Sequence, residues 1–97
     1  MSNEYPRESE LETIENWDLI GKPVMDLLDY VRNLWKYDER FVLTGKKVLR
    51  LYLSTGGWSG NEDIIDALHQ NSLFWSMYWE KSRAGGHYLF RINLKKL

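Results

Sequence analysis

Two glycine-rich segments contain the residues that could bind a ligand. The first is GGWSGNE, residues 56–62, which precedes a predicted helix. Free backbone N–H groups at a helix start favour an anion, but this segment matches neither common phosphate-binding glycine motif, and acidic residues in the first helical turn would repel a phosphate. The ordinary interpretation is a turn followed by a helix that Ser59 caps. The alternative is a binding loop that presents Trp58 and Asn61.

The second segment is RAGGHY, residues 83–88. Arg83, His87 and Tyr88 around two glycines could recognise an anion or a base by hydrogen bonding and stacking. The ordinary interpretation is a hairpin loop in which His87 starts a strand. If the two glycine segments converged, Arg83 and His87 would hold an anion and Trp58 would stack on a base, so that the ligand would be nucleotide-like.

Aromatic residues are abundant, with five Trp, six Tyr and three Phe. Those near the C-terminus could form a core, a stacking platform for single-stranded nucleic acid, or a protein-binding surface, because Trp and Tyr are enriched at interface hot spots. A stacking platform usually lies in a basic groove. The aromatic set is Trp75, Tyr78, Trp79, Tyr88 and Phe90, and the cations available to it are Lys81, Arg83, Arg91 and Lys95.

No signature of catalysis or of metal binding stands out. Catalysis needs a nucleophile beside a base, or two carboxylates in one cleft, whereas Asp66 and His69 have the spacing of a surface pair on a helix. The chain has no Cys and only two His, which excludes disulfides and thiolate metal sites. We therefore predict that the protein is not an enzyme and needs no cofactor or metal.

Charge and hydropathy limit the partners and the location. No run of about 18 apolar residues exists, and the acidic N-terminus is unlike a signal peptide, so we expect an intracellular protein with no membrane partner. Residues 1–40 hold ten acidic and five basic residues, a net of −5, and residues 41–97 hold four acidic and eight basic residues, a net of +4. The molecule is then either dipolar, or its two halves lie against each other.

The first half of the chain predicts two helices. Residues 1–8 are expected to be a flexible acidic tail, and residues 9–97 a single domain. Ser9 and Glu12 have the capping-box spacing of a helix start, which predicts a short helix through about Trp17. Pro23 then begins an amphipathic helix whose apolar residues recur at steps of three and four.

The remaining residues predict a hairpin, a helix and a second hairpin. Strands are expected near 40–44 and 47–54, and Leu49, Leu51 and Leu53 of the second strand share one sheet face. A helix follows near 60–70 and ends at Asn71. For residues 73–79 a strand is favoured over continuation of the helix, because Asn71-Ser72 indicates a break. The predicted fold is α+β, with a four-stranded, mainly antiparallel sheet and helices on one face.

The pattern GGWSGNEDII…N…FW…W…S…GGHYLF, which covers about residues 55–92, resembles a family of small uncharacterised proteins of tailed phages and prophages. The resemblance implies a phage accessory protein that acts in the cytoplasm of the bacterial host cell, where such proteins commonly bind a host or defence component. It implies no activity.

The leading hypothesis is therefore a non-enzymatic phage or prophage protein that binds a host or defence-system protein through an aromatic-rich surface. One alternative is a nucleotide-like small-ligand binder or sponge that uses loops 56–61 and 83–88. Another is a single-stranded nucleic-acid binder, although the net charge of −1 argues against nucleic acid. Self-association through an uncovered sheet face also stays open. The predicted binding residues are Trp58, Asn61, Trp75, Trp79, Arg83, His87 and Tyr88.

Overall fold

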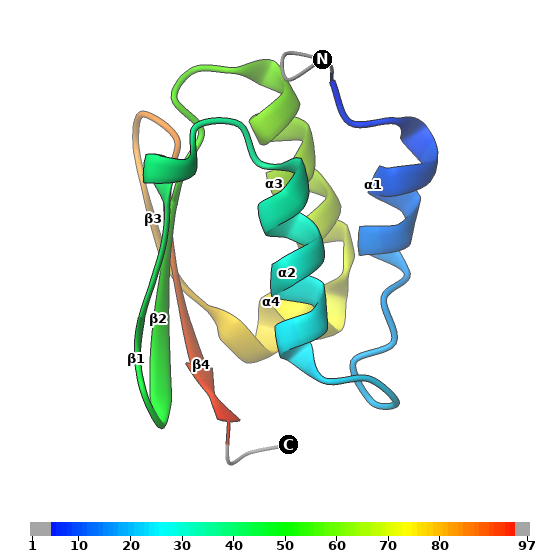
Figure 1. Cartoon of the computed structure of the whole chain (residues 1–97), viewed down its shortest axis with the longest axis vertical. Coiled ribbons are helices and arrows are strands. Elements are labelled where there is room, and N and C mark those ends of the chain that lie inside the picture. Colours follow the sequence, from blue (N-terminus) through cyan, green and yellow to red (C-terminus); the bar gives the residue numbers. More distant parts are fainter. Residues whose placement is uncertain (1–4, 95–97) are drawn as a thin grey trace.

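The structure is a computed structural model of the 97-residue chain, and it describes residues 5–94. Half of the predicted flexible tail, residues 1–4, lies outside the described residues. Figure 1 shows two layers, a twisted sheet and a group of helices on one of its faces. The elements in chain order are α1 (Glu8–Glu15), α2 (Val24–Leu34), the short 3₁₀ helix η1 (Asp38–Arg40), β1 (Phe41–Gly45), β2 (Val48–Ser54), α3 (Ser59–Gln70), α4 (Ser72–Tyr78), β3 (Trp79–Arg83) and β4 (His87–Asn93).

The sheet joins the two hairpins through their second strands. Its order is β1-β2-β4-β3, and every neighbouring pair is antiparallel. The predicted α+β fold, with a four-stranded antiparallel sheet and helices on one face, is confirmed. Because β2 and β4 pair along their whole length, the first hairpin lies beside the second although residues 55–78 separate the two hairpins in the chain. The outer strands of the sheet are β1 and β3.

The core lies between the sheet and the helices. Leu49, Leu51 and Leu53 of β2 are buried, as their alternation predicts, and Phe90 of β4 pairs with Leu51. Phe74 of α4 packs on Phe90, with ring centroids 5.4 Å apart. Figure 1 shows no helix on the other side of the sheet. We call this side the open face, and the alternate residues of the strands lie on it.

The predicted strand at residues 73–79 is wrong, because residues 72–78 form helix α4 and β3 begins only at Trp79. The break at Asn71 is real, but it separates two helices. Asn71 is the C-cap of α3, as predicted, and its Oδ1 also accepts a hydrogen bond from the Phe74 N–H at 3.1 Å. The helical spacing of Phe74 and Tyr78 buries both on one side of α4.

Both predicted serine caps are displaced. The first helix begins at Glu8 with Arg7 as its N-cap, and the Arg7 N–H donates to Glu10 Oε1 at 2.8 Å. In α3 the N-cap is Trp58 and Ser59 is the first helical residue, so Ser59 does not cap this helix. Each helix therefore starts one or two residues earlier than a serine cap would place it.

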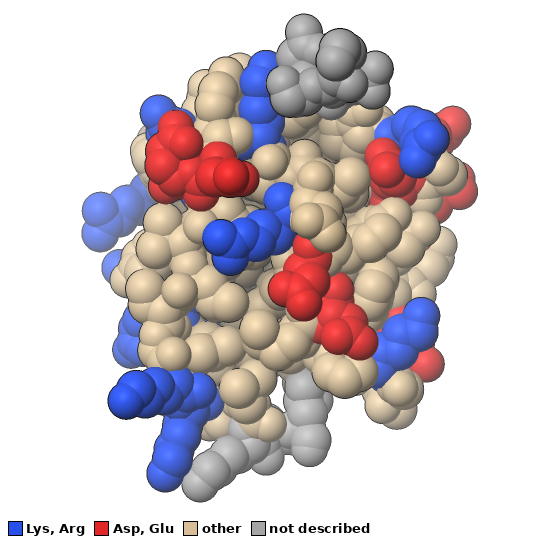
Figure 2. All heavy atoms as spheres, in the orientation of Figure 1, with Lys and Arg blue, Asp and Glu red and all other residues tan. Residues whose placement is uncertain are grey.

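Charged residues divide between the two layers. Helices α1, α2 and α3 together contain nine acidic residues and one arginine. The four strands contain four basic residues and one acidic residue. In Figure 2 blue atoms gather along the left margin, on the side of the sheet, and red atoms lie over the helical layer and at η1. The chain is therefore dipolar across its layers, with the basic end on the sheet.

Candidate functional site

The two glycine-rich segments meet at one end of the sheet. The Thr55 N–H donates to the Gly86 carbonyl at 2.9 Å. Thr55 is buried, and Gly86 has a φ of +82° and lies so close that an added Cβ would collide with Thr55 Oγ1. Beside them Ser54 and His87 are register partners, and Ser54 Oγ and His87 Nδ1 share a hydrogen bond of 3.0 Å. The two loops are therefore neighbours, although none of residues 56–61 lines the hollow beside them.

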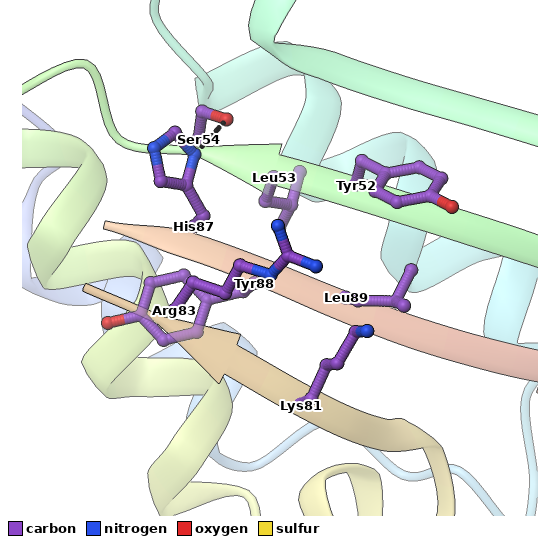
Figure 3. Close-up of a pocket in the computed structure, with 8 residues that line it drawn as sticks. All are labelled: Tyr52, Leu53, Ser54, Lys81, Arg83, His87, Tyr88 and Leu89. Atoms are coloured by element: carbon purple, nitrogen blue, oxygen red, sulfur yellow. Dashed lines mark hydrogen bonds between the residues drawn. The ribbon is translucent and has the colours of Figure 1, made fainter. Parts of the chain in front are cut away.

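A hollow of about 360 Å³ lies next to this junction on the open face. Figure 3 shows its side chains, with Lys81 and Arg83 reaching from β3 over β4 toward Tyr52 on β2. Tyr52 is 45% exposed, and Leu89, paired with both Tyr52 and Lys81, lies between them as an apolar floor. The hollow is lined by Tyr52, Leu53, Ser54, Lys81, Arg83, His87, Tyr88 and Leu89.

The lining is positively charged and holds no carboxylate. The one ion pair found among residues 5–94 joins Arg7 to Glu10 in the helical layer, so neither Lys81 nor Arg83 has a carboxylate at ion-pair distance within that range. Arg83 is the register partner of His87, which places its charge beside the Ser54–His87 hydrogen bond. Such a site favours an anion that accepts hydrogen bonds.

The Ser54–His87 pair resembles a serine nucleophile with a histidine base. In an activated nucleophile of this kind a third group orients the base. No carboxylate hydrogen-bonds to His87 in the part of the chain that the structure describes, and the pair is already explained by cross-strand neighbours on the ladder. We therefore interpret the pair as a fixed polar wall of the hollow.

Trp58 lies at the same end of the molecule but outside the lining of the hollow. Its ring stacks on Tyr5, with centroids 5.1 Å apart and planes 8° apart, and lies under Lys36 Nζ at 4.9 Å. It also folds back over Gly60, where an added Cβ would collide with the indole. Trp58 therefore packs against its own chain, which explains a large side chain on this loop.

Asn61 is fully buried, and its side chain hydrogen-bonds to the backbone of two loops. Its Oδ1 accepts from the Lys36 N–H at 3.0 Å, and its Nδ2 donates to the carbonyls of Lys36 and Thr55 at 3.0 and 3.2 Å. These three bonds tie the segment after α2 to the segment after β2. Asn61 thus positions Thr55, and through Thr55 the Gly86 turn, instead of facing a ligand.

Trp75 and Trp79 form a second feature, on the helical side of the outer strand β3. Their rings stack with centroids 5.9 Å apart, and Tyr88 meets Trp75 edge-on at 6.3 Å. In Figure 3 the Tyr88 ring points away from Tyr52 and Lys81. Tyr88 therefore lies at the edge of the hollow, and its ring contacts Trp75. We call Trp75, Trp79 and Tyr88 the aromatic strip; of these residues Trp79 is exposed.

Sequence reasoning found Arg83 and His87 but missed Tyr52, Ser54 and Lys81 as partners in one hollow. A signal for Tyr52 was present, because it alternates with the buried leucines of β2 and must therefore face away from the core. The pairing of β2 with β4, which brings Tyr52 to Leu89 and Ser54 to His87, has no local signal. Lys95 lies outside the described residues.

A metal site and a membrane-spanning helix are both absent from residues 5–94. No group of three or more His, Cys, Asp or Glu residues there could hold a metal ion. No helix among the described residues is both long and apolar enough to cross a membrane.

Comparison of the chain with family models, with curated proteins and with solved structures finds no match.

Proposed function

We propose that this protein binds a small phosphate-bearing, nucleotide-like ligand in the hollow on its open face. The observation that carries the proposal is the approach of Lys81 and Arg83, two cations without a carboxylate partner in the described range, to an exposed tyrosine over an apolar floor. Cations supply charge-assisted hydrogen bonds to phosphate oxygens. An exposed aromatic ring supplies a stacking surface for a base.

Each wall of the hollow has a part in this proposal. Arg83 binds phosphate oxygens through its planar guanidinium, and Lys81 adds a second charge. Tyr52 stacks on the base, whereas the sequence had suggested Trp58 as the stacking residue. Ser54 and His87 provide hydrogen-bonding groups at the end where the glycine loops meet. The resemblance to phage proteins adds a biological setting, in which a sponge of this kind removes a nucleotide signal from the host.

Isothermal titration calorimetry with ADP, adenosine and pyrophosphate tests the proposal. We expect ADP to bind more tightly than adenosine, which lacks the phosphates, and more tightly than pyrophosphate, which lacks the base. Arg83→Gln should weaken ADP at least tenfold, about 1.4 kcal/mol. The control is Lys22→Gln, which removes an exposed cation from the helical layer, where Lys22 lies over Trp17. Equal ADP affinity in both variants would reject the hollow as the site.

A second candidate function is the binding of a partner protein through the aromatic strip. The observation that favours it is the Trp75–Trp79 stack, which leaves Trp79 42% exposed. Exposed aromatic residues that are held by packing are typical of interface hot spots. The strip borders β3, whose five residues are all exposed and whose outer edge can pair with another strand. The leading sequence hypothesis of a host or defence-system partner applies to this surface.

Affinity capture from bacterial lysate, compared between the native chain and Trp79→Ala, tests this second function. A specific partner should be lost with Trp79→Ala and kept with Tyr52→Ala, because Tyr52 lies on the opposite face of the sheet. A partner that both variants retain would show that the aromatic strip is not its binding surface.

A further inference from the structure

The open face holds a second pair of cations that the hollow does not use. Arg50 of β2 and Arg91 of β4 are direct register partners, and both are exposed. Like charges directly opposite each other destabilise a sheet, and neither arginine has a carboxylate at ion-pair distance among residues 5–94. Residues 5–94 therefore supply no counter-charge for this pair, whereas an anion bound between the two guanidinium groups would.

A second hollow, of about 760 Å³, adjoins this pair. Besides Arg50 and Arg91, its lining reaches around β3 to the end of α4 and includes Glu80, the one acidic residue on the strands. The other lining residues are Ser76, Met77, Tyr78, Trp79 and Asn93. Glu80 lies at an irregularity of β3, where the pairing shifts between Trp79 and Lys81. It is not within ion-pair distance of either arginine.

The two hollows follow each other along the strands. On β2 the open face presents Arg50, Tyr52 and Ser54 in turn, two residues apart, and such a step is about 7 Å. The pair Arg50–Arg91 is thus one rung from Tyr52 and two rungs from the Ser54–His87 pair. Cations therefore extend over about 14 Å of the face, with an exposed tyrosine between them. A single nucleotide in the first hollow leaves the arginine pair without a phosphate.

We propose that the open face binds single-stranded nucleic acid along β2 and β4, with successive phosphates at Lys81, Arg83 and the Arg50–Arg91 pair. This inference rests on the proposed function and extends its ligand from a nucleotide to a polymer. Stacking on Tyr52 requires an unpaired base, which favours a single strand over a duplex. The acidic helices lie on the other side of the sheet, so they keep the polymer on this face.

Fluorescence anisotropy with a labelled ten-nucleotide oligothymidylate, titrated at several KCl concentrations, tests the inference. Three phosphate contacts on a single strand, with the arginine pair sharing one phosphate, predict a slope of log K against log [KCl] of about −2.1. The double variant Arg50→Gln/Arg91→Gln should weaken the oligonucleotide at least tenfold and reduce the slope to about −1.4. Its affinity for ADP should not change. A ten-base-pair duplex should bind more weakly than the single strand.

The matched control is Lys22→Gln/Arg32→Gln, which removes the same charge from the helical layer and should leave oligonucleotide binding intact. If ADP binds but the oligonucleotide binds no more tightly, or is indifferent to Arg50→Gln/Arg91→Gln, the polymer inference is overturned and the nucleotide site stands. Duplex binding equal to that of the single strand also overturns it. If the arginine pair matters but Lys81→Gln and Arg83→Gln affect neither ligand, the proposed nucleotide site is overturned instead.

Discussion

The substitution Gly86→Ala should disrupt the junction that builds the candidate site. Gly86 has a φ of +82°, a region that L-residues other than glycine rarely adopt, and an added Cβ would collide with the buried Thr55 Oγ1. Thr55 cannot simply retreat, because its N–H is bonded to the Gly86 carbonyl at 2.9 Å. The turn must therefore shift, and with it Arg83 and His87.

The neighbouring Gly85 provides a matched control. Its φ is +92°, but an added Cβ would meet only His87 ring atoms at 3.5 Å, an ordinary contact. Gly85→Ala should therefore lose only the backbone preference, about 1–2 kcal/mol. Gly86→Ala should lose this and about 1–3 kcal/mol more for the overpacked contact. In a domain of this size each kcal/mol lowers Tm by roughly 4–8 °C.

Urea denaturation followed by tryptophan fluorescence measures both free energies of unfolding. In a double-mutant cycle, Thr55→Ala should recover part of the loss in Gly86→Ala and none of the loss in Gly85→Ala, because only the former substitution contacts Thr55 Oγ1. ADP affinity should fall in Gly86→Ala more than in Gly85→Ala. Equal stability of the two glycine variants, or no coupling to Thr55, would refute the proposed contact between the loops.

Three further substitutions test other parts of the structure. Asn71→Ala should lower the free energy of unfolding by about 2–4 kcal/mol, because it removes the α4 cap and leaves the Ile14 and Trp17 carbonyls, which Asn71 Nδ2 binds at 2.9 and 3.3 Å, without their donor. Asn71→Asp keeps the acceptor for the Phe74 N–H but places a buried carboxylate oxygen against both carbonyls, so urea denaturation should show no recovery of stability. Tyr78→Phe should raise stability by about 1 kcal/mol, since the buried Tyr78 hydroxyl has no hydrogen-bond partner among the described residues. Burial raises the pKa of Tyr78 above its ordinary 10.0. Above pH 10 the Tyr78 hydroxyl therefore ionises in the unfolded state but not in the folded state, so the free energy of unfolding of the native chain should fall as pH rises. Thermal melts from pH 9 to 11 should show a smaller fall in Tyr78→Phe. Arg91→Gln should stabilise the sheet by about 0.2–1 kcal/mol at low salt, because it relieves repulsion from Arg50. Thermal melts in 1 M KCl, where the Debye length is about 3 Å, should show this gain in stability largely removed. A gain that persists in 1 M KCl would contradict the electrostatic explanation.

Most element types could be predicted from local patterns. The steps of three and four in α2 and the alternation of leucines in β2 are properties of the chain itself, since side-chain direction follows the backbone period. The same alternation requires Arg50 and Tyr52 to point away from the core. Asn71 was recognised as a helix end for a local reason as well, because its side chain serves neighbouring backbone groups.

The segment at residues 72–78 shows where local patterns fail. Its apolar residues fit both a strand and a helix, and a seven-residue window does not separate the two periods. The outcome depends on Asn71, which caps α4 while also bonding to the Ile14 carbonyl of α1, and on Phe74, which packs against Phe90 of β4. Both partners are distant in sequence, so tertiary contacts selected the helix.

The sequence by itself determined the α+β class, the first hairpin and the choice of Arg83 and His87 as anion-binding candidates, because each follows from periodicity or from side-chain chemistry. Only the tertiary structure decided that Thr55 meets Gly86, that Tyr52 and Lys81 complete the hollow, that Trp58 packs away from it, and that Arg50 faces Arg91. All four follow from the register between β2 and β4 or from packing around the loops they join. A register is set by the summed burial of a whole sheet face, and no single stretch of the chain contains that sum.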